Sequence, residues 1–319
     1  MPSQRHAIFA CFLLPLAGVS FSAGCGDSLQ SPPTVQETEK LSPRQEHEAL
    51  IKKVEEGDVD AQFAAARMYD KGEVVIKDSA KAAKWYQKAA AQGHPGAQYM
   101  LGTMYISGDV LPRDPAKAAE WFQKSAEQGS APAQNLLGVM YYKGEGLPRN
   151  AAKAVAWYQK AAAQGDSDAQ NNLGLMYALG EGVPRDPAKA AELLHKAAAQ
   201  GLPSAQGAVG WLYANGTGVP KDPVKAVEWY RKAALQGDPE AQLHLGWSYL
   251  TGIGIPRDRV LAYAWLNLAA RSSLGSAVKS RNLYEARLSP DEVSEAQRLS
   301  SNWKKGQTMS RERLQVVAN

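Results

Sequence analysis

The sequence predicts an all-α protein, an α/α superhelical solenoid of about six helix-turn-helix repeats followed by a C-terminal capping helix. An Ala-Gln pair returns every 36 residues, at Ala61-Gln62, Ala97-Gln98, Ala133-Gln134, Ala169-Gln170, Ala205-Gln206 and Ala241-Gln242. Tyrosines keep the same interval, at Tyr69, Tyr105, Tyr141, Tyr177, Tyr213 and Tyr249. A period in this range indicates stacked units, each unable to bury its apolar face without a neighbour.

Residues 1–24 predict an export signal, because Arg5 precedes an apolar run from Ala7 to Val19 and the small residues Ser22-Ala-Gly24 offer a cleavage site. Ser22-Ala-Gly-Cys25 is similar to the lipobox of bacterial lipoproteins, whose cysteine is acylated. The resemblance implies a lipid on Cys25, and in a Gram-negative cell it implies an outer-membrane location. Ser22 stands where that family usually has leucine, so secretion without a lipid is the alternative.

Residues 25–45 are rich in Ser, Pro, Thr, Gln and Glu and have no apolar periodicity, which predicts a flexible tether. The repeats are expected to occupy residues 46–275, with capping helices over 276–306 and a tail over 307–319. The cap is predicted from Ser289-Pro-Asp-Glu292, which has the sequence of a capping box.

Each unit is expected to contain two helices, and Gly93 to Gln128 shows them most clearly. The first helix is predicted over Pro95–Ser107, with Gly102 leaving room for the second helix to approach. The second helix is expected to open at Asp114-Pro115 and to place an apolar stripe in the core. In the next unit this stripe includes Trp157, whose replacement by alanine would cost about 3–5 kcal/mol if the ring is a core residue.

Charge and cysteine content exclude several kinds of function. Lys+Arg 36 nearly match Asp+Glu 32, for a net charge of +4, so we expect no nucleic-acid partner. The two cysteines, Cys11 and Cys25, both precede the repeats, which leaves the body without a disulfide, a thiolate metal site or a nucleophilic thiol. We therefore expect no catalytic residue, no metal, no cofactor and no small-molecule substrate, and the repeat histidines His94, His195 and His244 are predicted to be surface residues.

The complete unit carries a family resemblance. It reads Ala-Gln-x-x-Leu-Gly-x-Met-Tyr, then Gly-x-Gly-Leu-Pro-Arg, then Ala-x-x-Trp-Tyr-x-Lys-Ala-Ala, and this pattern is similar to the Sel-one-like repeat (SLR) family, relatives of tetratricopeptide repeats. The resemblance covers about Gly57 to Ala270. It implies a right-handed solenoid that acts in envelope assembly, polysaccharide export or signalling control. The first unit departs from the pattern at Ala66, where the other units have glycine.

The variable positions of the first helices suggest a binding surface. If these helices line the concave face, as in tetratricopeptide relatives, the candidates for contacting a protein or peptide partner are Asn135, Tyr142, Asn171, Leu175, Trp211, Leu243, Trp247 and Leu250. Tryptophan and tyrosine are enriched among binding hot spots, and asparagine can hydrogen-bond a peptide backbone. The alternative is that Trp211 and Trp247 pack between helices, with Trp247 touching the C-terminal cap.

These observations favour a non-enzymatic interaction scaffold in the bacterial cell envelope, exported and held to the membrane by a lipid on Cys25. A second hypothesis is a periplasmic regulator that restrains a membrane sensor. A third comes from cysteine-rich members of the family linked to β-lactam binding or hydrolysis. In those members a disulfide crosslinks each repeat, and the repeats of this chain contain no cysteine to form one.

Overall fold

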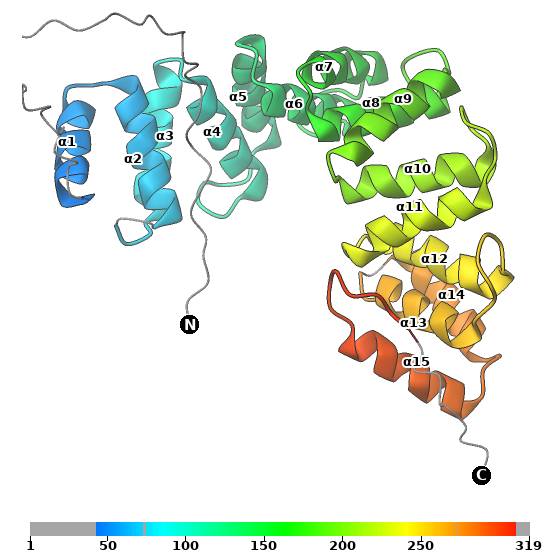
Figure 1. Ribbon diagram of the computed structural model, residues 1–319. Helices are drawn as coiled ribbons and strands as arrows, with labels where there is room; N and C mark the ends of the chain where they lie inside the picture. Colours follow the sequence, from blue (N-terminus) through cyan, green and yellow to red (C-terminus); the bar gives the residue numbers. More distant parts are fainter. Residues whose placement is uncertain (1–42, 73–74, 273, 311–319) are drawn as a thin grey trace, which may run out of the picture. The chain divides into compact units, whose positions relative to one another are not determined.

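The computed structural model describes residues 43–72, 75–272 and 274–310, and these residues form fifteen α-helices and no strand (Figure 1). The all-α solenoid predicted from the sequence is thereby confirmed. The expected signal peptide, Cys25 and the tether up to residue 42 lie outside the described residues. Helix α1 (Pro43–Glu55) begins three residues before the position predicted for the start of the helical body.

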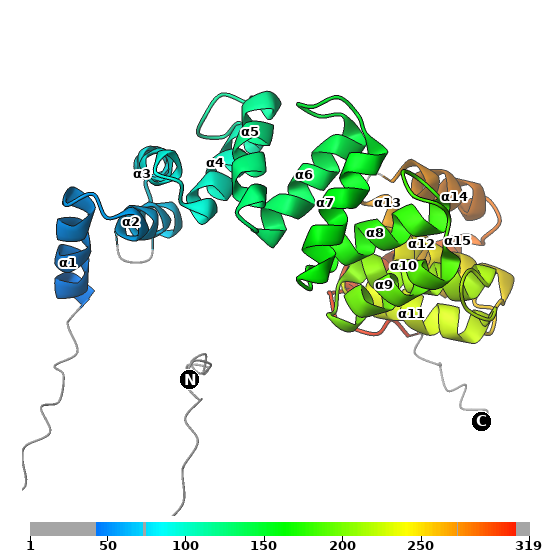
Figure 2. The same cartoon turned by 90° about the horizontal axis from the view of Figure 1, so that it is seen from above.

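Helices α2 to α13 form six units of two helices each. The first helices of the units are α2 (Val59–Lys71), α4 (Pro95–Ser107), α6 (Ala131–Lys143), α8 (Ser167–Leu179), α10 (Pro203–Asn215) and α12 (Pro239–Thr251). The second helices are α3 (Ser79–Ala91), α5 (Pro115–Glu127), α7 (Ala151–Ala163), α9 (Pro187–Ala199), α11 (Pro223–Leu235) and α13 (Arg259–Ala270). Each helix packs against the next along the chain, as Figures 1 and 2 show, so every unit covers the apolar face of its neighbour.

Local sequence signals set the helix ends. Asp114 opens α5 as an N-cap, its Oδ1 accepting the Lys117 N–H at 3.1 Å, and its own N–H donates to the Tyr105 carbonyl at 2.9 Å. Gly108 ends α4 with a left-handed φ of 77°, a conformation that glycine adopts without strain. The bond to Tyr105 ties the start of the second helix to the end of the first, which explains why tyrosine and aspartate share one period.

Glycine in the first helix permits the close contact within a unit. A Cβ on Gly138 would lie 2.6 Å from Cε1 of Tyr158, which is buried in the second helix of the same unit. Corresponding glycines face Phe122, Leu194, Tyr230 and Leu266 in the four other units that carry one. The prediction that this glycine makes room for the second helix is confirmed.

Trp157 differs from its predicted place in the core. The neighbouring Tyr158 is buried, whereas Trp157 is only half-buried. Its ring packs against a buried cluster formed by α5 and α6, and Lys160 Nζ lies 3.9 Å from the ring centroid. Tyr158 and Trp157 follow each other on the helix and so point about 100° apart, which lets only one of them face the helix partner directly.

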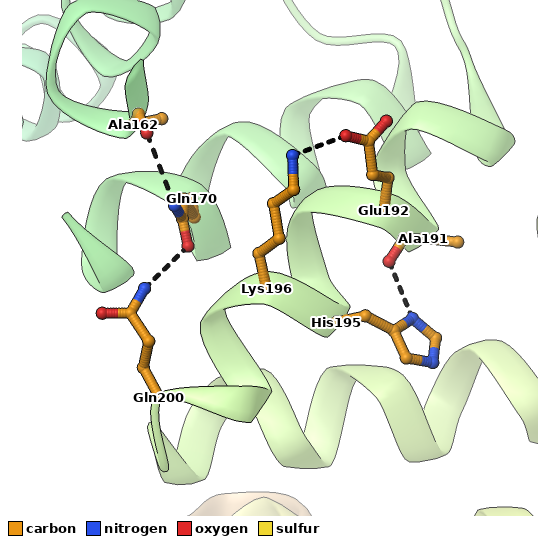
Figure 3. Close-up of polar contacts among 7 residues, drawn as sticks. All are labelled: Ala162, Gln170, Ala191, Glu192, His195, Lys196 and Gln200. Carbon is orange, nitrogen blue, oxygen red and sulfur yellow. Dashed lines mark hydrogen bonds and ion pairs between the residues drawn. The ribbon is translucent and has the colours of Figure 1, made fainter. Parts of the chain in front are cut away.

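A row of glutamines links the units. The Gln170 side chain is buried in α8, donates to the Ala162 carbonyl of α7 at 3.4 Å and accepts from Nε2 of Gln200, at the end of α9, at 2.9 Å (Figure 3). Equivalent pairs of glutamines, 30 residues apart, join Gln62 to Gln92, Gln98 to Gln128, Gln134 to Gln164 and Gln206 to Gln236. One buried amide thus connects three successive helices, a role that the periodicity alone did not reveal.

Helices α14 (Gly275–Glu285) and α15 (Pro290–Asn302) follow the last unit and both pack against α13. Ser289 and Glu292 form the capping box expected at the start of α15. Trp303 meets Trp265 of α13 edge to face at 5.8 Å, and the Gly306 N–H donates to the Leu235 carbonyl at 2.7 Å. Helix α15 and the segment after it therefore cover apolar surface that α13 would otherwise expose.

Candidate partner-binding site

A pocket of about 330 Å³ lies between the first helices of three successive units, α8, α10 and α12. Its walls are mainly apolar, and its floor is Leu194 of α9. We call it the central pocket; its lining consists of Asn171, Leu175, Ala178, Leu179, Leu194, Ser204, Gly207, Ala208, Trp211, Leu212, Asp238, Glu240, Ala241 and His244. Three residues proposed from the sequence, Asn171, Leu175 and Trp211, are brought together here.

Residue 207, which lines the pocket, has no side chain. The corresponding position of the other units carries Phe63, Tyr99, Asn135, Asn171 or Leu243. A Cβ placed on Gly207 would meet nothing closer than Asp238 Oδ1 at 3.5 Å and Ala241 Cβ at 3.8 Å. The space beside residue 207 is therefore open to a ligand, and glycine at this position is the sequence signal for it.

Asn171 brings a buried oxygen without a hydrogen-bond partner to the lining of the pocket. It is 8% exposed, and its Oδ1 is buried and accepts no hydrogen bond from the described residues. Leaving a buried acceptor unpaired costs about 1–3 kcal/mol. A ligand that donates a hydrogen bond to Asn171 would recover this energy.

The polar end of the pocket belongs to α12. Asp238 caps this helix, its Oδ1 accepting the Ala241 N–H at 2.7 Å, and Glu240 lies exposed in the first turn. His244 is half-buried and stacks on Tyr230, with ring centroids 4.8 Å apart. Burial lowers the pKa of His244, although Glu240 and Asp238 act in the opposite direction.

The other predicted residues lie outside the central pocket. Trp211 and Trp247 occupy equivalent slots and are both 40% exposed, but only Trp211 lines the pocket. Leu243 and Leu250 are half-buried and pack against the core of the last unit. We therefore place Trp247 on the same face of the first helices, one unit beyond Trp211.

Asn135 and Tyr142 already have partners within the chain. Oδ1 of Asn135 accepts a hydrogen bond from Nδ2 of Asn172 at 3.1 Å, across the boundary between two units. A hydrogen bond to the Glu181 carboxylate raises the pKa of Tyr142, and the Arg149 guanidinium carbon lies 5.7 Å from the Tyr142 ring centroid. Both side chains hold α6 to its surroundings, so a ligand would meet them only by displacing these contacts.

The repeat histidines, predicted to be surface residues, lie only partly at the surface, since each is half-buried and has a defined contact. His94 is the N-cap of α4, its Nδ1 accepting the Ala97 N–H at 3.1 Å, and it stacks on Phe63. His195 Nδ1 lies 2.8 Å from the Ala191 carbonyl oxygen, as Figure 3 shows. A ring with a large apolar face and one hydrogen bond suits these partly apolar positions.

Over 43–72, 75–272 and 274–310, no cluster of three or more His, Cys, Asp or Glu side chains is placed to hold a metal ion. Within the same ranges no helix combines the length and apolar character needed to cross a membrane.

A second pocket, of about 310 Å³, lies between α2 and α4. It is lined by Phe63, Arg67, Asp70, Lys71, Tyr86, Gly96, Tyr99 and Met100. The buried Tyr86 hydroxyl also accepts and donates no hydrogen bond among the described residues. None of the residues proposed from the sequence lies there, whereas the central pocket contains three of them. The central pocket is therefore the stronger candidate site.

The unit seen in the structure matches a known repeat. A family model of the Sel1 repeat matches six contiguous segments, residues 59–94, 95–130, 131–166, 167–202, 203–238 and 239–274. No match was found among curated protein sequences. Among solved structures, the chain is similar to a Sel1 repeat protein from Oxalobacter formigenes, with 34% identity and a TM-score of 0.63 over 67% of this chain and 85% of that one.

Two further solved structures share the repeat. A protective antigen of uropathogenic Escherichia coli that displays an SLR fold is 25% identical over 81% of this chain and 86% of its own, with a TM-score of 0.45. A putative Sel1 repeat protein from Klebsiella pneumoniae is 25% identical over 64% of this chain and 99% of its own, with a TM-score of 0.45.

Proposed function

Because the chain belongs to the Sel1 repeat family, we propose that it is a non-enzymatic scaffold that binds an extended segment of a protein partner across α8, α10 and α12. Sel1-repeat proteins are typically protein–protein interaction scaffolds. The central pocket is the proposed centre of the surface, with Trp247, Leu243 and Leu250 continuing it toward the C-terminus.

The observation that carries this proposal is the unpaired Asn171 oxygen in a largely apolar pocket. An extended peptide presents backbone N–H groups at regular intervals, and one of them can donate to Asn171 while a side chain enters the pocket. The half-exposed Trp211 ring supplies a large rigid surface of the kind that dominates binding energy in protein interfaces. The site thus offers a hydrogen bond for affinity and a cavity for selectivity.

We further propose that the protein works outside the cytoplasm, held to a membrane by a lipid on Cys25. Support comes from the sequence of residues 1–25, where an apolar run precedes Ser22-Ala-Gly-Cys25. Metabolic labelling with palmitate and cell fractionation test this proposal. Wild-type protein should carry label and sediment with membranes, and a Cys25→Ala variant should do neither; an unlabelled wild-type protein in the soluble fraction would show secretion without a lipid.

The equivalent tryptophans provide a matched test of the binding surface. A photo-crosslinking amino acid at Leu179, on the exposed rim of the pocket, should capture a defined partner in cells, whereas the same amino acid at Gln159 on α7 should not. Trp211→Ala should then reduce the capture more than Trp247→Ala does, because only Trp211 lines the pocket. Equal capture from Leu179 and Gln159, or capture that survives Trp211→Ala and is lost with Trp247→Ala, would contradict a site centred on the pocket.

A further inference from the structure

We propose that the central pocket selects a lysine or arginine side chain of the bound segment, its aliphatic stem lying against the apolar walls and its cationic head at Asp238 and Glu240. This inference rests on the proposed function and names the chemistry of the partner. It follows from the distribution of charge around the pocket, from the shape of its walls and from the unpaired acceptor at Asn171.

The first helices that line the pocket, α8, α10 and α12, carry charge of one sign. Helix α10 has no charged residue, α8 has only Asp168 and α12 has only Glu240, while Asp166 and Asp238 cap α8 and α12. The positive charges of units four to six lie instead on the second helices and in the turns. Although the whole chain has a net charge of +4, this surface is acidic, and it would attract a basic segment.

The acidic groups at the pocket are available to a ligand. Among the described residues, neither Asp238 nor Glu240 forms an ion pair within 4.0 Å. Because residue 207 has no side chain, Asp238 Oδ1 would lie only 3.5 Å from a Cβ built there, so the Asp238 carboxylate borders the open space. Lys305 approaches this end of α12, with its Nζ 3.2 Å from a Cβ built on Gly237, but it forms no ion pair with Asp238 or Glu240 within 4.0 Å.

The walls suit the stem of a basic side chain. Leu175, Leu194 and Ala208 offer aliphatic surface, and Trp211 offers an aromatic face. Lysine and arginine bury their methylene stems on apolar surfaces while the charged head stays at the polar edge, and a cation gains further energy over a tryptophan ring. An acidic side chain would be repelled by Asp238 and Glu240, and a purely apolar one would leave them without a partner.

The buried acceptor supplies an independent reason for a peptide ligand. Asn171 sits across the pocket from α12, on α8, with its oxygen unpaired and the side chain 8% exposed. It would accept a backbone N–H of the same segment whose side chain fills the pocket. The ligand is therefore a donor at both ends of the site: a backbone amide at Asn171 and a cationic head at α12.

The test uses a library of random peptides displayed on phage and selected on the purified full chain, followed by titration of one selected peptide labelled with fluorescein. One position of the selected peptides should be enriched in lysine or arginine. Exchange of this residue for norleucine, which keeps the stem, should weaken binding about 2- to 5-fold, as expected for loss of a partly exposed ion pair. Exchange for glutamate should weaken it further.

Paired protein variants connect this preference to the pocket. Asp238→Asn combined with Glu240→Gln keeps the helix cap but removes both charges, and should abolish the preference for lysine over norleucine. The control variant, Asp166→Asn with Asp168→Asn, removes two negative charges from the equivalent positions of α8, which do not line the pocket. It should keep the preference for lysine over norleucine. Circular dichroism confirms that each variant is folded.

The outcomes separate this inference from the proposed function. Selected peptides that bind equally well with lysine, norleucine or glutamate, yet lose binding when Gly207→Leu fills the pocket, would overturn the choice of a basic side chain and leave the binding site in place. A preference for lysine that persists in the Asp238→Asn, Glu240→Gln double variant would also overturn the choice of a basic side chain. Selected peptides whose binding is unaffected by Gly207→Leu and Trp211→Ala, or no selected peptide at all, would overturn the proposed site itself.

Discussion

The same substitution at two glycines of α10, three residues apart, should change the stability of the fold differently. Gly207→Ala adds a methyl group in open space, 3.5 Å or more from its neighbours. Gly210→Ala places the same methyl group 2.7 Å from Cδ1 of Tyr230 and 3.1 Å from the Ala226 carbonyl oxygen. Both changes improve helix propensity by about 1 kcal/mol, so the difference between them isolates packing.

The magnitude follows from how little Tyr230 can move. Its ring is buried in α11 and stacks on His244, with the ring planes 18° apart, and the Ala226 carbonyl belongs to the helix backbone. Inserting a methylene-sized group into such a core costs about 1–3 kcal/mol. Gly207→Ala should therefore raise the free energy of unfolding by about 1 kcal/mol, whereas Gly210→Ala should leave it unchanged or lower it by up to about 2 kcal/mol.

Urea unfolding followed by far-ultraviolet circular dichroism measures both effects on the full chain. Neighbouring units of a solenoid unfold with limited cooperativity, which can broaden the transition. Both glycines lie in α10, however, so both variants report on the same part of that transition. Stabilisation of similar size by both substitutions would refute the close contact at Gly210, and destabilisation by Gly207→Ala would refute the open space at Gly207.

Three further predictions concern the frame of the repeats. Gln134→Met should lower the free energy of unfolding by about 1–2 kcal/mol in urea, because it leaves hydrogen-bonding groups of two neighbouring helices unpaired, and Gln164→Met at the exposed end should cost less. Trp157→Ala should lower the free energy of unfolding by about 1–2 kcal/mol, and Tyr158→Ala, at a buried side chain, by about 3–5 kcal/mol. Equal losses would contradict the difference in burial. Since burial lowers the pKa of His244 in the folded state, stability should fall as pH drops below about 6.5, and His244→Gln should remove that part of the dependence between pH 7.5 and 5.5.

The sequence predicted the frame of the fold well because the frame depends on short-range rules that repeat. Asp114-Pro115 marks a helix start wherever it occurs, and Gly108 marks an end, so six copies of the pattern reinforce one another. The expected first helix, Pro95–Ser107, agrees with α4 at both ends. The function of the Ala-Gln pair was missed because its hydrogen bonds join residues 30 apart in the chain.

The site was only partly predictable. Variable positions of the first helices directed attention to Asn171, Leu175 and Trp211, which the structure places around one pocket. The list also included Asn135, whose oxygen is occupied by Asn172, because the sequence does not say which of several asparagines finds a partner in the next unit. The acidic residues of α12 were absent from it, since helix-capping alone accounts for Asp238 in the sequence.

The central pocket and the pocket between α2 and α4 occupy equivalent positions of the repeat. Phe63, Tyr86 and Tyr99 line the second pocket, and three units later the same positions carry Asn171, Leu194 and Gly207. An amide, an aliphatic side chain and a glycine thus replace three aromatic rings. The hollow belongs to the repeat frame, and the residues that line each copy decide its shape and its chemistry. A repeat frame can therefore carry a selective cavity without any change in its helix ends, its turns or its glutamine contacts, which explains how a binding site can coexist with such regular packing.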